Sequence, residues 1–130
     1  MSTLFTKILN HELPGHFVYE DEKCGVFLSI APIVRGHLLV VPRSEVEHWI
    51  DLSSDDMNHC FAVAQKIGKV LMKTFTPNKI GVLIAGLEVP HTHIHLLPIM
   101  SEADLFKRPQ EASQEELAEV AELIRRNMQD

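Results

Sequence analysis

A chain of 130 residues with 45% hydrophobic and 23% charged side chains is long enough to bury a core of its own without disulfides. Its formal net charge of −6 disfavours binding to long nucleic acids, which require a basic face, so we expect no nucleic acid polymer as a partner. Cys24 and Cys60 form no Cys-x-x-Cys pair, which argues against a thiolate zinc finger. Because the sequence shows no secretory signal and no apolar run that could cross a bilayer, we predict a cytoplasmic protein without membrane contact.

The first half of the chain predicts one short helix followed by three strands. Apolar side chains recur at helical spacing in residues 3–10, and Pro14 with Gly15 ends this helix. Two β-branched and aromatic runs around a polar turn predict a hairpin, and an apolar run closed by a proline predicts a buried strand. These three strands are expected at residues 16–21, 24–30 and 37–42.

The second half predicts a long amphipathic helix, two strands and a C-terminal helix. Ser53 and Ser113 each precede an acidic residue by three positions, a pattern that is typical of helix starts. The helices are expected at residues 53–75 and about 113–128, and the strands at 79–86 and 91–99. Short connections between the strands favour an α+β fold with an antiparallel sheet and helices on one face, in a single domain spanning residues 1–130.

The most unusual feature is the run HTHIHLLP, which places His91, His93 and His95 two residues apart. On a strand, this spacing puts all three side chains on one face, with adjacent Cα atoms about 7 Å apart. The intervening residues then face the helices and the core. Three histidines in strict alternation are hard to attribute to chance, so we expect them to act on a common ligand.

Two kinds of chemistry suit such a cluster. A His-x-His pair on a strand is a good zinc-binding element, for which His37, His48 or Glu88 could supply a third ligand. Alternatively, a neutral imidazole can attack phosphorus and form a covalent intermediate that water later cleaves. This second chemistry needs an acceptor for the other ring nitrogen and donors for the developing phosphoryl charge, and flanking histidines can supply both.

Residues His91 to Leu97 fit the H-φ-H-φ-H-φ-φ signature of the histidine triad (HIT) superfamily, where φ is apolar, with Thr92 as a slightly polar first spacer. The chain resembles this superfamily in order and spacing up to about residue 100. Within it, the chain is most similar to Hint-like small bacterial proteins with GLEVPH before the triad. The resemblance implies a HIT-like fold: a five-stranded antiparallel sheet with one long central helix and a C-terminal helix. It also implies a homodimer whose sheets join across the long helix and a strand.

The resemblance further implies a nucleotide hydrolase or nucleotidyl transferase that acts at the α-phosphorus, with nucleoside phosphoramidates or related conjugates as substrates. The expected ligand is a purine nucleotide or nucleotidyl conjugate, and no cofactor or metal is expected. His93 matches the family's nucleophile, which becomes nucleotidylated before water releases a nucleoside monophosphate. His95 resembles the residue that contacts the phosphate, and His91 the residue that orients the nucleophile through hydrogen bonds.

Several apolar positions match the family's base and ribose pocket, although core packing explains each of them equally well. They are Leu4, Phe5, Ile8, Phe27, Leu28 and Ile30. Ser29 replaces an aspartate that holds the ribose, which predicts altered sugar binding. Glu88 lies near the place of a serine that assists the leaving group, and Glu45 stands where a histidine is more common. These departures keep a non-catalytic nucleotide-binding module open as an alternative, with a zinc-binding hydrolase as a third; His37 is expected to be structural.

Overall fold

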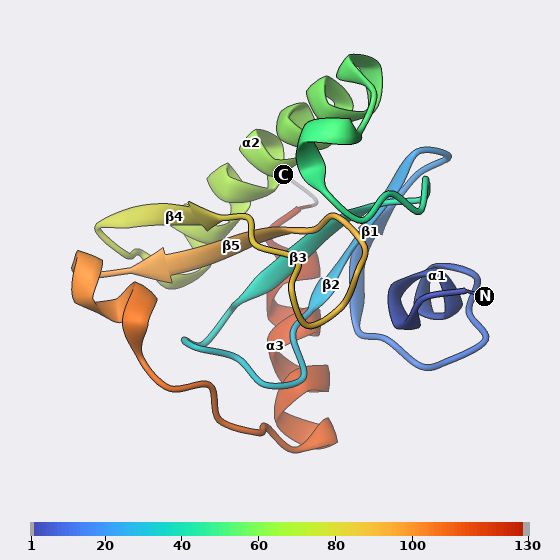
Figure 1. Cartoon of the computed structure of the whole chain (residues 1–130). Coiled ribbons are helices and arrows are strands. Elements are labelled where there is room, and N and C mark those ends of the chain that lie inside the picture. The colour runs from blue at the N-terminus through green and yellow to red at the C-terminus, as the bar shows by residue number, and fades with distance from the viewer. Residues whose placement is uncertain (1, 129–130) are drawn as a thin grey trace.

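The computed structural model describes residues 2–128, in which three strands follow a short helix and two further strands lie between two longer helices (Figure 1). The elements are α1 (Leu4–Leu9), β1 (Phe17–Glu20), β2 (Cys24–Leu28), β3 (Leu38–Pro42), η1 (Trp49–Asp51), α2 (Ser54–Phe75), β4 (Lys79–Leu83), β5 (Ile94–Ile99), η2 (Glu102–Phe106) and α3 (Gln114–Arg126).

The strands form one five-stranded sheet in the order β1-β2-β3-β5-β4, with every neighbouring pair antiparallel. This confirms the predicted α+β fold and its antiparallel sheet. β3 and β5 are neighbours in the sheet, although α2 and β4 separate them in the chain. Their register pairs Leu39 with His95 and Val40 with Ile94. Because paired residues point to the same face, the side that carries Leu39 also carries His95.

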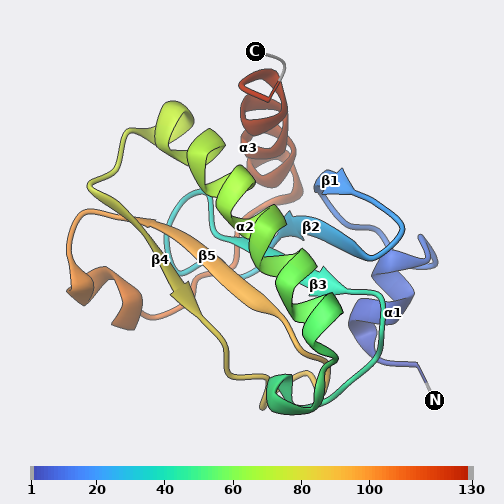
Figure 2. The same cartoon turned by 90° about the horizontal axis from the view of Figure 1, so that it is seen from above.

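The long helix α2 and the C-terminal helix α3 cover one face of the sheet (Figure 2). Ser53 caps α2 by accepting a hydrogen bond from the Asp56 N–H, as the capping pattern predicts. Ile67 and Leu71 of α2 are fully buried against the sheet, and burial of each contributes about 1.5–3 kcal/mol. The opposite side of α2 is exposed and mostly polar, although Phe61 and Met72 are also exposed there. Within residues 2–128 no helix is long and apolar enough to traverse a bilayer.

The short helix α1 packs on the opposite face, so the prediction that the helices share one face holds for α2 and α3 but not for α1. Its buried side chains Phe5, Ile8 and Leu9 form a second, smaller cluster with Phe27, Leu39 and Val41 of β2 and β3. Since α1 covers only the β2 and β3 end of this face, the neighbouring part at β5 remains open for the histidines.

Candidate active site

The three histidines of the triad gather beside Phe5 on the face that carries α1. The ring centroid of Phe5 lies 4.7 Å from that of His93 and 6.0 Å from that of His91. The rings of His93 and His95 are 4.8 Å apart. The alternation therefore brings all three side chains to one side of the chain, as the sequence predicts.

The strand itself is shorter than predicted, because β5 begins at Ile94 and only His95 of the triad lies within it. The cause lies in the neighbouring strand. Pro42, which ends β3, has no N–H to donate, so the ladder cannot continue past this point. Thr92 instead donates both its N–H and its hydroxyl hydrogen to the carbonyl of Val46, at 2.7 and 2.8 Å.

The ring of His93 is oriented by the backbone of its own segment. Its Nδ1 lies 2.7 Å from the carbonyl oxygen of His91. A carbonyl only accepts hydrogen bonds, so Nδ1 carries the hydrogen. In the neutral ring the other nitrogen, Nε2, then holds a lone pair. His93 is therefore set up as a base or nucleophile at Nε2.

His95 has the opposite polarity, which His37 imposes on it. The N–H of Ile33 donates to Nδ1 of His37 at 3.1 Å, so the hydrogen of the neutral His37 ring is on Nε2. That Nε2–H donates to Nδ1 of His95 at 2.8 Å. His95 consequently carries its own hydrogen on Nε2 and can donate it to an oxygen in the site.

His91 is held at both ring nitrogens. Its Nε2–H donates to the carbonyl of Pro42 at 2.7 Å, and its Nδ1 lies 2.7 Å from the hydroxyl of Thr3. Hydrogen bonds thus occupy both nitrogens of His91 and the Nδ1 atoms of His93 and His95. The two remaining ring nitrogens of the triad have complementary roles: Nε2 of His93 holds a lone pair, and Nε2 of His95 holds a hydrogen. A zinc ion bound by all three imidazoles would have to break at least one hydrogen bond of His91.

Burial keeps these rings neutral. Desolvation lowers the pKa of His93, and it lowers the pKa of His95 to about 4, with a further effect from the neighbouring His93. Burial, followed by the nearby His95 and His93, lowers the pKa of His37 to about 3. At neutral pH the rings of His37, His93 and His95 are therefore uncharged. This preserves the lone pair of His93 and the direction of the hydrogen bond between His37 and His95.

Residues 10–102 match the family model of the HIT domain. The chain belongs to the HIT family. A HIT-like protein involved in cell-cycle regulation from Bartonella henselae has a solved structure that is 28% identical, covers 97% of this chain and 96% of its own, and superposes with a TM-score of 0.86. A Zn-bound histidine triad family protein from Mycobacterium smegmatis is 25% identical, with a TM-score of 0.83 and coverage of 98% and 94%. An adenosine 5'-monophosphoramidase of Saccharomyces cerevisiae is 28% identical over 73% of this chain and 61% of its own length.

The neutral histidines of this HIT protein predict that acid destabilises it. His37 has a lower pKa in the folded state than its ordinary value of 6.5, so the unfolded chain takes up the proton first as the pH falls. The stability that this shift in the pKa of His37 contributes is fully present above pH 6.5 and is lost as the pH falls below that value. From His37 alone we expect the free energy of unfolding to fall by about 1.5 kcal/mol between pH 6.5 and pH 5, and His95 acts in the same direction.

Urea unfolding across this pH range measures the effect. The His37→Gln variant, which cannot take up the proton, should show a shallower dependence of unfolding free energy on pH. Equal slopes for the two proteins would contradict the assignment of a neutral His37.

Three of the six apolar residues predicted for the pocket pack together on the histidine face of the HIT fold. Phe5, Ile8 and Phe27 are buried there, and the ring of Phe27 packs edge-on against Phe5 at 5.7 Å. Leu4 and Ile30 are 46% and 63% exposed and belong to neither buried cluster. Phe5 links the apolar wall directly to His93.

Leu28 was predicted to line this pocket, and its position corrects that expectation. Side chains alternate along β2, so Leu28 points away from the histidines and joins the cluster under α2 and α3, whereas Phe27 faces the triad. Ser29 lies at the end of the same strand, where its hydroxyl accepts the N–H of Ala31 at 3.3 Å and keeps its own hydrogen available. Glu88 is exposed in the segment between β4 and β5.

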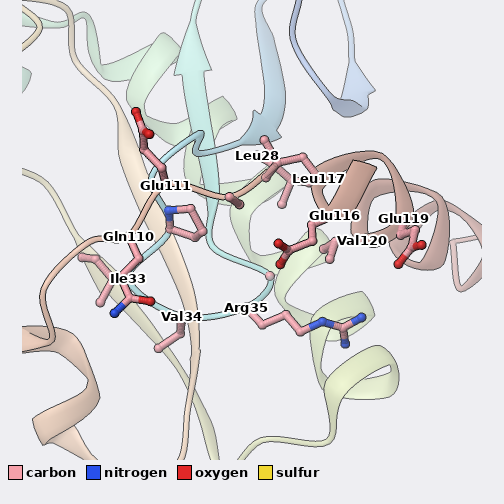
Figure 3. A pocket seen from close by; sticks show the side chains of 13 residues that line it. Leu28, Ile33, Val34, Arg35, Gln110, Glu111, Glu116, Leu117, Glu119 and Val120 are labelled. Carbon is pink, nitrogen blue, oxygen red and sulfur yellow. The ribbon is translucent and has the colours of Figure 1, made fainter. Parts of the chain in front are cut away.

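The loop between β2 and β3, whose Ile33 N–H orients His37, is hydrogen-bonded to the segment that precedes α3. The N–H groups of Gln110 and Ala112 donate to the carbonyls of Pro32 and Ile30, at 3.2 and 3.3 Å. Figure 3 shows the hollow between this loop and α3. Its lining residues are Leu28, Pro32, Ile33, Val34, Arg35, Gly36, Gln110, Glu111, Ala112, Glu116, Leu117, Glu119 and Val120. The triad takes no part in this hollow, which instead borders the loop that carries Ile33.

Sequence reasoning assigned His37 a structural role and Thr3 none, yet both contact the triad. The signal for His37 was its place beside Leu38, at the start of a buried strand. Its partner could only be found with the register that pairs Leu38 with Leu96, next to His95. For Thr3, which lies 88 residues from His91, the sequence contains no comparable signal.

Proposed function

We propose that this protein is a hydrolase that cleaves nucleoside phosphoramidates, or related nucleotidyl conjugates, at the α-phosphorus through a nucleotidyl intermediate on His93. The observation that carries the proposal is the pairing of two neighbouring rings of opposite polarity. Nε2 of His93 holds a lone pair, and Nε2 of His95 holds a hydrogen. The monophosphoramidase activity of the yeast relative supports the same substrate class.

In the first step, Nε2 of His93 attacks the α-phosphorus and the bond from phosphorus to the amine breaks. The amine leaves with the bonding pair and takes up a proton from solvent, which the second step returns. The His95 N–H donates to a phosphoryl oxygen as negative charge develops on it. The His93 ring becomes a cation whose Nδ1–H still donates to the carbonyl of His91, and this hydrogen bond stabilises the positive charge.

In the second step, water attacks the same phosphorus and the bond to Nε2 of His93 breaks. The water loses a proton to solvent, the ring recovers its lone pair and a nucleoside monophosphate is released. The sum of the two steps is one water consumed, one amine and one monophosphate formed. The buried rings of Phe5 and Phe27 form an apolar wall behind the reacting ring.

The test is a search for the covalent intermediate. The protein is mixed with the phosphoramidate of AMP and a fluorescent amine, quenched within milliseconds and examined by intact mass spectrometry. We expect a mass increase of one adenylyl group, which peptide mapping places on His93. Turnover without such an adduct on His93, under conditions in which its release is slow, would refute the mechanism.

A non-catalytic nucleotide-binding module is the second candidate. Ser29 favours it, because one hydroxyl makes fewer hydrogen bonds with a ribose than a carboxylate does, and a weak grip on the sugar weakens positioning for catalysis. Calorimetry that shows AMP binding, together with no hydrolysis across a panel of nucleotidyl amines, would favour this candidate over the hydrolase.

We also propose that the protein forms a homodimer through α2 and β4. β4 is an edge strand, and the groove between it and α2 exposes large apolar side chains to solvent. Phe61, Met72 and Val82 are 42%, 40% and 45% exposed along this groove. An apolar face beside an open sheet edge is a typical site for association, and the homodimer implied by the family resemblance joins across the corresponding elements.

A charged residue in this groove should therefore separate the subunits. We expect the Val82→Asp variant to sediment as a monomer at concentrations where the natural protein is a dimer, with an unchanged circular dichroism spectrum. The Ile50→Asp variant is the matched control, because Ile50 is 62% exposed and does not line the groove. Dimers that withstand Val82→Asp would place the interface elsewhere.

A further inference from the structure

A network of hydrogen bonds joins the start of α1 to the triad. The Thr3 hydroxyl lies 2.7 Å from Nδ1 of His91 and accepts the N–H of Thr6 at 3.1 Å as the cap of α1. Oε1 of Glu45 accepts two further hydrogen bonds, from the Thr3 N–H at 2.8 Å and from the Thr6 hydroxyl at 2.7 Å. Three segments that are distant in sequence meet at this point.

The carbonyl of Pro42 and the carboxylate of Glu45 can only accept hydrogen bonds, and they determine which atom donates in the bonds between them. The carbonyl of Pro42 requires the hydrogen of His91 on Nε2, so Nδ1 must accept and the Thr3 hydroxyl must donate to it. At the other end, the carboxylate of Glu45 takes the hydroxyl hydrogen of Thr6. The hydrogen bonds from the Thr3 N–H and then from the Thr6 hydroxyl hold the pKa of Glu45 below its ordinary value, so this acceptor stays ionised at neutral pH.

We propose that Thr3, held in place by Glu45, is a positioning residue that fixes His91 and, through the His91 carbonyl, aims Nε2 of His93 at the phosphorus. The proposal rests on the hydrolase function proposed above. It gives Glu45 a part in the site, and it assigns Thr3 and Glu45 an effect on the chemical step without contact with the substrate.

The chain of contacts explains how a residue at the start of the protein can influence the nucleophile. The His91 ring is fully buried, and without the Thr3 hydroxyl the nearest donor to Nδ1 would be the Thr6 hydroxyl, which lies 3.5 Å away and already donates to Glu45. Loss of the Thr3 hydroxyl would therefore weaken the hold on the ring and favour its shift toward water. The His91 carbonyl is the group that orients the His93 ring at 2.7 Å. Misplacement of a reacting group by about 1 Å can cost up to about 10²-fold in rate. Glu45 is exposed, so its own contribution is the smaller one.

The decisive comparison is Thr3→Val against Thr3→Ser. Valine keeps the shape of the side chain and removes the hydroxyl, whereas serine keeps the donor. We expect Thr3→Val to lower kcat about tenfold with KM changed by less than about twofold, and Thr3→Ser to retain kcat within about twofold. A role confined to folding of α1 would instead raise KM, because Phe5 lies on that helix and walls the site.

Glu45→Leu tests the second member of the network, with Glu12→Leu as control because Glu12 is exposed and close to α1 but outside the network. We expect Glu45→Leu to lower kcat about threefold to fivefold and Glu12→Leu to leave it unchanged. If turnover depends on His93 but kcat is equal for the natural protein, Thr3→Val and Glu45→Leu, the positioning role of Thr3 and Glu45 is overturned. The proposed hydrolase function would then still stand.

Nuclear magnetic resonance gives a readout that does not require turnover. In the natural protein and in Thr3→Ser, the nitrogen signal of His91 Nδ1 should show a hydrogen-bonded acceptor, and the Nδ1–H of His93 should exchange slowly with water. Thr3→Val should shift the first signal and broaden the second. If both signals are unchanged in Thr3→Val, the proposal fails even if the protein proves to have no hydrolase activity.

Discussion

The His93→Ala variant is expected to lose at least about 10³-fold in kcat/KM for a nucleoside phosphoramidate and to form no nucleotidyl adduct. Alanine removes the only ring nitrogen of the triad that offers a lone pair to the site, because the other lone pairs accept hydrogen bonds from Thr3 and His37. The donors of the site remain, but they only stabilise an attack that now has to come from water.

The measurement is steady-state hydrolysis of the fluorescent phosphoramidate, with the adduct followed by mass spectrometry. Binding of AMP by calorimetry is the control, since the substitution leaves His95 and the packed rings of Phe5 and Phe27 in place and should retain affinity within about tenfold. A His93→Ala variant that keeps natural turnover would exclude the covalent mechanism. A variant that loses AMP binding and activity together would show that His93 serves the pocket rather than the reaction.

The His37→Leu variant is expected to lower kcat by about 10²-fold, the second largest effect, although His37 does not reach the substrate. Leucine cannot donate to Nδ1 of His95, so the His95 ring is free to adopt the tautomer with its hydrogen on Nδ1. His95 then presents a lone pair to a phosphoryl oxygen that needs a donor, and the developing negative charge loses its stabilising hydrogen bond. KM should change little, because the apolar wall is on another element.

The matched control is His37→Gln. The glutamine amide can accept the N–H of Ile33 and donate to Nδ1 of His95, so it can replace both hydrogen bonds of His37. We expect His37→Gln to retain kcat within about tenfold of the natural protein. If both variants lose activity equally while their circular dichroism spectra are unchanged, the shape of the imidazole matters rather than its direction of donation.

The sequence predicted the elements of this fold because their patterns are local. The helical spacing of apolar residues and the cap at Ser53 located α2, and the family resemblance predicted a five-stranded antiparallel sheet but not its strand order. The sequence alternation also predicted that His91 and His95 lie on one side, although His91 precedes β5 and is held there by Pro42 and Thr3. Each of these predictions depends on residues that are near one another in the chain.

The errors and omissions have a common cause, which is dependence on distant partners. The strand at residues 91–99 was predicted to start too early because Pro42, a residue of another strand, ends the ladder. Leu28 was placed in the pocket because a family match does not reveal which face of β2 a side chain occupies. The hydrogen bonds of His37 and Glu45 cross 58 and 42 residues of sequence, and a single sequence contains no record of such contacts.

The hydrogen bonds that polarise His93 and His95 differ greatly in their span, and this has a consequence for biosynthesis. The carbonyl that directs His93 lies two residues away, so a nascent chain can make that contact as soon as this segment has left the ribosome. The donor to His95 lies 58 residues away and requires β3 and β5 to have found their register, a slow, non-local event. Onset of turnover during translation would therefore report closure of the sheet rather than emergence of His93.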